Sequence, residues 1–175
     1  DAIGNSVNYV NGVQHVQPVN VDGNYFINTG TFFGQPTKIK GLRMGYGVNL
    51  FTSHLSSYIN TEKNTTDRYN IGPNANFSYD IDNKLNAGVY LGVQYSMVNN
   101  SLPAAIDNKY FSFWNNASVS WEFVKNMRIN TELQHNGTAG RADGFNNNVF
   151  LLNAGLEQYL MKRRVTLAIR GFDIL

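Results

Sequence analysis

The sequence predicts an all-β fold of long antiparallel strands, on the strength of three observations. Apolar and polar side chains alternate along residues 84–99, the pattern of a strand with one apolar and one polar face. At about 3.3 Å per residue this segment spans roughly 45 Å, far more than a usual strand of about 5–6 residues. No apolar run approaches the roughly 18 residues of a transmembrane helix. Together these features predict an antiparallel up-and-down transmembrane β-barrel, with about nine long strands here forming part of a larger barrel.

The alternation in residues 84–99 also divides the side chains between two faces. Leu85, Ala87, Val89, Leu91, Val93, Tyr95 and Met97 point one way, and Asn86, Gly88, Tyr90, Gly92, Gln94 and Ser96 point the other. An alternating strand of this length can cross a bilayer at a tilt and project beyond it. We therefore expect the first set to face lipid and the second to face the barrel lumen.

The N-terminal part of the chain predicts two strands. Residues 2–10 form the first, and Asn11-Gly12 is a strong signal for a two-residue hairpin turn. Residues 13–33 keep one alternating phase straight through Gly23, so we expect one long strand with a bulge or bend at that glycine. A tight turn at residues 34–37 then ends it.

The middle of the chain repeats the pattern. Residues 40–58 and 68–81 alternate, with a polar loop expected at 59–66 between them and a turn at Asp82-Asn83 after them. Residues 84–99 follow, and the segment 100–109 is expected to be a second long loop.

The C-terminal part predicts the remaining strands at residues 110–123, 128–137, 148–160 and from 165 onward. Turns are expected at 124–127 and 161–164, and a third long loop at 137–147. Short turns would then lie at one rim and long loops at the other, which is the asymmetry of outer-membrane barrels. No internal domain boundary is visible, so residues 1–175 are expected to be one region, a partial barrel without a plug domain or final strands.

Charged side chains follow the polar phase. A charge on the lipid face near the bilayer midplane costs about 2–4 kcal/mol, so lipid-facing positions should lack charge. Asp173 is the exception to this rule. The predicted lumen-facing set is Arg43, Asn86, Gly88, Gly92, Gln94, Glu132, Glu157 and Arg170. The predicted lipid-facing set is Leu85, Val89, Leu91, Val93, Phe113, Val119, Trp121, Leu152, Leu156 and Leu167.

Aromatic spacing agrees with a membrane span. Phe113 and Trp121 are separated by about 20 Å of height at a tilt near 40°, and Phe111 and Phe123 by about 30 Å. These pairs bracket an apolar band of about 25 Å between two aromatic girdles. The alternative is that the aromatic side chains fill the core of a soluble β-protein.

Composition and motifs indicate no nucleic-acid binding, no metal site and no catalytic site. A net charge of +2 gives no basic field for nucleic acid, and the absence of Cys excludes disulfides and Cys-ligated zinc. The three histidines have no metal-site spacing, and nothing in the sequence brings Glu132 and Glu157 together as an acid–base pair, so no enzyme activity and no cofactor are expected. Arg141 and Asp143 lie in the third long loop, expected to be extracellular, where an exposed turn could contact a ligand.

Three segments carry a family resemblance: PVNVDGNYFINTGTFF, GRADGFNNNVFLLNAGLEQYL and KRRVTLAIRGFDIL. They resemble the C-terminal barrel portion of outer-membrane proteins of the TonB-dependent-receptor-like class in Gram-negative bacteria. The resemblance implies a barrel of about 22 strands around a plugged lumen. It also implies uptake of a siderophore, glycan or peptide, often with a surface lipoprotein and with energy from TonB. No ligand-binding residue is implied, because those residues vary within the class.

Three functional hypotheses follow. The first is part of an outer-membrane transporter, with outer-membrane lipids, the rest of the barrel or a partner chain along the open strand edges, and a surface lipoprotein and TonB as partners. The second is a non-transporting barrel that serves as a scaffold or subunit of an envelope complex. The third is a soluble β-sandwich or lipocalin-like binder.

Overall fold

A computed structural model describes residues 2–82, 84–103 and 106–175 as a β-structure. In this part of the chain no helix is long and apolar enough to cross a membrane. The strands are β1 (Ala2–Val10), β2 (Val13–Val21), β3 (Tyr25–Pro36), β4 (Leu42–Ile59), β5 (Glu62–Ile81), β6 (Leu85–Asn100), β7 (Asn108–Val124), β8 (Met127–Ala139), β9 (Asn147–Leu160) and β10 (Val165–Gly171).

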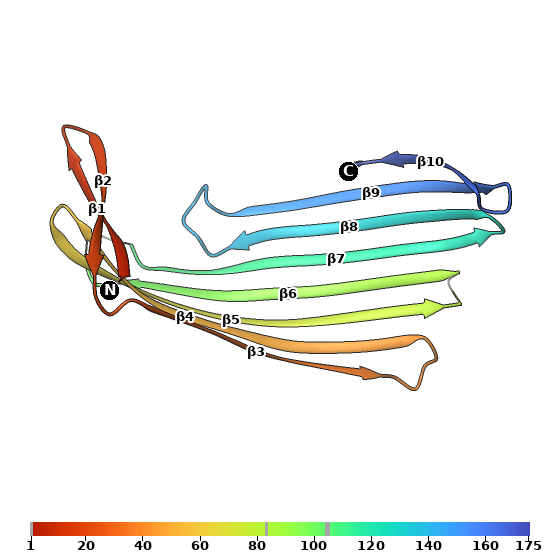
Figure 1. The fold of residues 1–175 in the computed structure, drawn as a ribbon, viewed down its shortest axis with the longest axis horizontal. Coiled ribbons are helices and arrows are strands. Elements are labelled where there is room, and N and C mark those ends of the chain that lie inside the picture. Colours follow the sequence, from red (N-terminus) through yellow and green to blue (C-terminus); the bar gives the residue numbers. More distant parts are fainter. Residues whose placement is uncertain (1, 83, 104–105) are drawn as a thin grey trace.

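All ten strands belong to one sheet (Figure 1). From β3 to β10 each strand pairs antiparallel with its neighbour in the chain, and β3 and β10 lie at opposite edges, so the sheet is not closed. The up-and-down architecture is therefore confirmed. A single layer excludes the sandwich alternative, and among the described residues Val21 is the one buried apolar side chain.

The expected strand over residues 13–33 is wrong, and the sheet accordingly has ten strands instead of about nine. The chain breaks at residues 22–24, where Gly23 has a φ of +81°. On one side of the break β2 pairs with β1, and on the other β3 pairs with β4. The alternating phase continues through Gly23 although the strand changes its partner there.

The β1–β2 hairpin projects from one end of the sheet (Figure 1). Its Asn11-Gly12 turn has positive φ at both residues, as a two-residue hairpin turn of this sequence requires. β1 joins the sheet through a short parallel contact, with Ser6 opposite Tyr58 and Val7 opposite Ile59. Val21 packs beneath this junction, close to Gly4.

The long loop expected at residues 59–66 is also wrong. β4 and β5 continue to a two-residue turn at Asn60-Thr61, both with positive φ, and their pairing reaches Ile59 opposite Glu62. A β-branched threonine with positive φ is uncommon, so this turn carries no sequence signature.

The turn expected at 34–37 lies at 37–41 instead, because β3 continues to Pro36, and the other connections follow the expected arrangement. The strand ends at 37–41, 82–84, 125–126 and 161–164 share one rim, although Asn83 lies outside the described residues. The longer connections 101–107 and 140–146 share the opposite rim with the Asn60-Thr61 turn, and residues 104–105 are not described. The asymmetry between rims is therefore present but weaker than expected. Asp173, the exceptional charge, lies after β10 has ended at Gly171.

An apolar band crosses one face of the sheet obliquely. The register aligns Leu85, Trp121, Ile129, Leu156 and Ile169 in one row across β6–β10. On β6 the apolar residues extend from that row in one direction, from Leu85 to Met97. On β9 they extend to both sides of it, from Leu160 near the short turns to Phe150 near the longer connections. This displacement corresponds to a tilt of about 45° between the strands and the normal to the band, close to that of membrane barrels.

Candidate functional site on the polar face of the sheet

The register gathers the polar side chains of the strands on one face, called here the polar face. One row of paired residues runs from Arg43 through Ser78, Gly88 and Ser118 to Glu132. All eight residues predicted to face a lumen share this face, because paired positions on neighbouring strands point the same way. Whether the face lines a lumen stays a prediction at this point.

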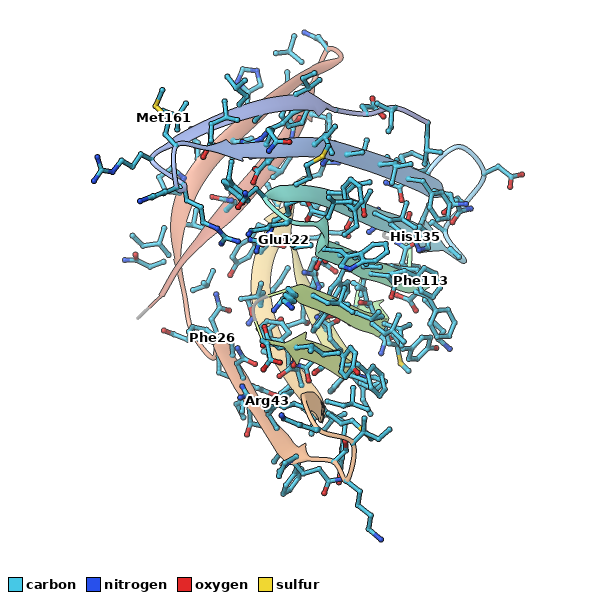
Figure 2. The ribbon with its side chains drawn as sticks, turned by 90° about the vertical axis from the view of Figure 1, so that its right-hand side faces the viewer. Phe26, Arg43, Phe113, Glu122, His135 and Met161 are labelled. Atoms are coloured by element: carbon cyan, nitrogen blue, oxygen red, sulfur yellow. The ribbon has the colours of Figure 1, made fainter. Side chains whose placement is uncertain are left out.

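The opposite face, called here the apolar face, holds the ten residues predicted to face lipid. Figure 2 shows Phe113 and His135 on the other side of the sheet from Glu122. Much of this face is uncovered: Leu91, Trp121 and Leu167 are 47%, 49% and 59% exposed. An uncovered apolar surface spanning many strands needs an apolar environment.

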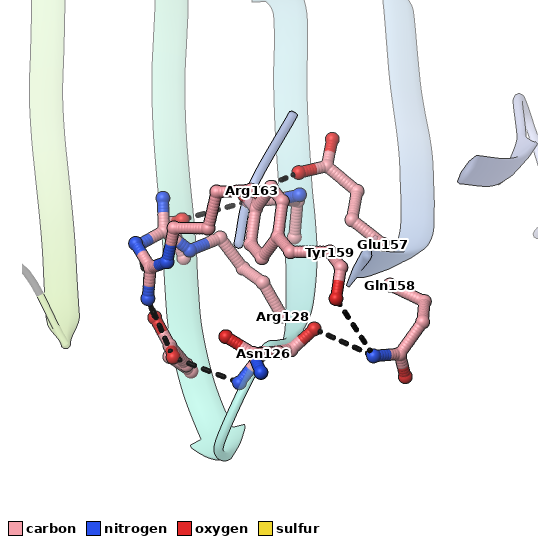
Figure 3. Close-up of polar contacts among 9 residues, drawn as sticks. Asn126, Arg128, Glu157, Gln158, Tyr159 and Arg163 are labelled. Atoms are coloured by element: carbon pink, nitrogen blue, oxygen red, sulfur yellow. Dashed lines mark hydrogen bonds and ion pairs between the residues drawn. The ribbon is translucent and has the colours of Figure 1, made fainter. Parts of the chain in front are cut away.

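On β7–β10 the polar face carries an ionic network near the short-turn rim (Figure 3). Arg163, in the turn after β9, donates two hydrogen bonds to the Glu122 carboxylate, at 2.8 Å and 2.7 Å. The same carboxylate accepts the backbone N–H of Asn126 at 3.0 Å and lies 3.8 Å from Arg128. Arg128 and Arg163 both lie over the Tyr159 ring. The network therefore joins two neighbouring hairpins.

A second ion pair continues this network from β9 to the edge strand β10. The Glu157 carboxylate accepts hydrogen bonds from Arg170 at 3.1 Å and from the Tyr159 hydroxyl at 2.9 Å.

Glu132 accepts amide hydrogen bonds from Asn116 at 2.8 Å and Gln134 at 3.0 Å. Polar groups in this half of the face thus satisfy one another.

Glu132 and Glu157 line one shallow hollow of about 290 Å³, together with Arg170. The sequence offered no reason to bring these two glutamates together. Their carboxylates are occupied by amides in one case and by Arg170 and Tyr159 in the other. The expectation that they do not act as a catalytic pair stays a prediction.

On β3–β6 the polar face is built from glycine, amides and aromatic rings. Phe32 lies over Gly45 and Gly47, and the Trp114 ring of β7 lies over Gly92. The Trp114 Nε1–H donates to the Tyr90 hydroxyl at 3.3 Å. Glycine is required at these positions because an added Cβ would collide with the ring or with backbone.

The two arginines in this half differ from those on β7–β10. Within the described residues, neither Arg43 nor Arg68 forms an ion pair or a hydrogen bond. Arg43 lies on the polar face of β4 (Figure 2), one row from the β3–β4 turn, and Arg68 lies on β5 toward the opposite rim.

Two histidines lie where the apolar band ends toward the rim with the longer connections. Sequence reasoning did not predict their contacts. His54 contacts Asp67 at 2.7 Å and stacks on Tyr25. His135 stacks on Phe150. Its ring is joined to Asn115 at 2.9 Å and to Asn148 at 2.7 Å. Cross-strand register creates these contacts, so no spacing along the chain could have indicated them. No group of three metal-ligating side chains occurs in the described ranges.

The connection at residues 140–146 places Arg141 and Asp143 at the rim opposite the ionic network (Figure 1). The Arg141 guanidinium lies 4.1 Å from the centre of the Tyr110 ring. The Arg141 backbone exchanges hydrogen bonds with the Asn146 amide, which closes the loop. Asp143 lies exposed at its tip.

The model of the "outer membrane protein beta-barrel family" matches residues 5–175 of the chain. No curated protein and no solved structure matches it.

Proposed function

The chain belongs to the outer membrane protein beta-barrel family, and on that premise we propose that its strands form one side of an outer-membrane transport barrel. Outer-membrane localisation and the barrel architecture follow from the family. The soluble-binder alternative is set aside for the same reason. The transport role, its energy source and its cargo are the proposal.

In this proposal the apolar face contacts lipid and the polar face lines the lumen. Lipid-exposed apolar side chains lose nothing in hydrocarbon, whereas the arginines and glutamates of the polar face would each cost several kcal/mol there. The tilt of about 45° matches strands that cross a bilayer.

Because the sheet is open, we propose that the complete barrel has more than these ten strands and a correspondingly wider lumen. Along β3 and β10 the outer edge has no partner strand among the described residues. Unpaired N–H and C=O groups at such an edge are not tolerated in hydrocarbon. We propose that further strands close the barrel, as in outer-membrane transporters whose lumen holds a plug.

The observation that carries transport is the polar face of β3–β6. Its two arginines and the amides of Asn28 and Asn49 form no hydrogen bond or ion pair within the described residues, which suits a wall that contacts water and a passing solute. We further propose that uptake depends on TonB, in a Gram-negative envelope, and that a surface lipoprotein covers the long-loop rim. The resemblance in sequence to TonB-dependent receptors supports this part.

The experiment uses the full-length protein reconstituted in planar lipid bilayers. A plugged transporter is expected to conduct little until mild urea unfolds the plug, and to bind the isolated periplasmic domain of TonB. A barrel that neither binds this domain nor gains conductance in urea would contradict the proposal.

A non-transporting scaffold barrel is the second candidate. The self-satisfied network on β7–β10 favours it, because such a wall offers few groups to a solute. The bilayer experiment distinguishes the two, since a scaffold needs no TonB contact.

A further inference from the structure

A hollow of about 540 Å³ lies on the polar face of β3–β6, and every one of these four strands contributes to it. Its lining residues are Asn28 of β3, Asn49 and Phe51 of β4, Arg68 and Asn70 of β5, and Gln94 of β6. Three asparagines, one glutamine and one guanidinium thus converge on one place.

Most of these polar groups have no partner in the chain. Arg68 forms no ion pair or hydrogen bond, and the same holds for the side-chain amides of Asn28 and Asn49, within the ranges that the structure describes. The Asn70 Oδ1 atom is buried and has no hydrogen-bond partner. Gln94 makes one bond, to Ser96 at 3.1 Å. A polar group shielded from water costs free energy unless a partner is supplied.

Two glycines, which have no side chain, lie beside the hollow and leave room in it. Gly30 and Gly72 lie on either side of Asn49 in the same register row. A Cβ at Gly72 would meet nothing closer than 3.5 Å, so glycine is not required there by packing. Its effect is to leave room beside Asn49 and Gln94.

We propose that this hollow binds a carboxylate-bearing polar solute. The carboxylate pairs with the Arg68 guanidinium, whose planar fork of N–H donors suits two parallel hydrogen bonds to a carboxylate. The free amides bind hydroxyl or carbonyl groups of the solute, and Phe51 supplies an apolar surface beside them. The inference rests on the proposed transport function and names the chemical class of its cargo. An acidic oligosaccharide and an acidic peptide both present this chemistry.

The test measures binding by calorimetry to the full-length protein in detergent, with two matched pairs of probes. Trigalacturonate is compared with its methyl ester, and triglutamate with triglutamine. In one pair the acid is expected to bind about tenfold tighter or more than its neutral counterpart. The pair that shows the preference identifies the source.

Three variants localise the effect. Arg68→Gln is expected to abolish the preference for the acid, and Asn49→Ala to weaken binding of both members of the pair. Lys125→Gln removes the same charge in the turn after β7 and is expected to leave binding unchanged. Equal or absent binding of acid and neutral probes in both pairs overturns the inference, as does a preference that survives Arg68→Gln. Binding without TonB dependence would instead contradict the proposed function alone.

Discussion

On β7–β10 the charged side chains of the polar face pair with one another, whereas on β3–β6 Arg68, Asn28 and Asn49 form no hydrogen bond or ion pair within the described residues. In the first region Arg128, Arg163 and Arg170 each lie beside a glutamate, and amides hold Glu132. In the second, Arg43 and Arg68 lie among amides and glycines without an ion pair in the described chain. The same face of one sheet thus combines a region whose charged groups pair with one another and a region whose polar groups are free to bind a solute.

Composition alone does not reveal this difference. Both regions show the same alternation and the same polar phase in the sequence. Only the register decides whether a polar residue meets a complementary partner on the next strand. Stability should therefore depend on the polar groups of β7–β10 and on the glycine–aromatic packing of β3–β6, while the free groups of β3–β6 should serve binding.

The largest effect is expected for Gly47→Ala, which tests the packing on β3–β6. A Cβ at this position would lie 2.5 Å from the Thr31 carbonyl oxygen and 3.1 Å from the Phe32 ring. Overpacking against backbone should lower the free energy of unfolding by about 2 kcal/mol. Guanidinium unfolding of the full-length protein in detergent measures it. Gly72→Ala, whose Cβ would meet only ordinary van der Waals contacts at 3.5 Å or more, should change stability by less than about 0.5 kcal/mol. Similar losses in the two variants would contradict this packing.

A smaller effect is expected for Glu122→Gln, which tests the ionic network on β7–β10. The amide still accepts the Asn126 N–H but loses its charge beside Arg163 and Arg128. The unfolding midpoint should fall at low salt, and the difference should shrink in about 1 M salt, where the Debye length is about 3 Å. Asp143→Asn, in the exposed loop, serves as the charge control. A difference that is independent of salt would refute an ionic origin.

Arg170→Gln tests the more exposed pair of the same region. Arg170 is 62% exposed and Glu157 is 14% exposed, so solvent screens most of their attraction. We expect a loss of about 0.5 kcal/mol in the free energy of unfolding. A double-mutant cycle with Glu157→Gln isolates the pair, and a coupling near zero would show that Arg170 contributes nothing to this region.

The smallest effect on stability is expected for Arg68→Gln. Because Arg68 has no ion pair or hydrogen bond with the rest of the described chain, its loss should change the free energy of unfolding by less than about 0.5 kcal/mol. Unfolding in guanidinium checks this beside the binding measurement above. A loss as large as that of Gly47→Ala would break the distinction between the two regions.

The sequence was sufficient for the strands that keep one partner on each side. The alternation of residues 84–99 became β6, Leu85–Asn100, and the Asn11-Gly12 turn formed where its dipeptide predicts. Period-2 patterning reports which face a side chain takes, and it does so wherever one face is apolar.

Patterning failed where the partner changed or the turn lacked a signature. At Gly23 the phase continues while the pairing moves from β1 to β4, and alternation carries no information about the partner. Asn60-Thr61 turns the chain with a threonine at positive φ, which tertiary pairing of β4 and β5 imposes. The candidate site was hidden for the same reason, because the contacts of His135 and the convergence of Asn28, Asn49 and Arg68 exist only across strands.

Pairing between chain neighbours from β3 to β10 has a consequence for how this wall is assembled. Each new strand finds its edge already formed by the strand made just before it, so the loops that must close are short and their entropic cost is low. The sheet can therefore grow by one hairpin at a time from either margin. The parallel contact of β1 with β4, which closes about fifty residues of chain, is the one pairing among the described strands that must wait for the rest.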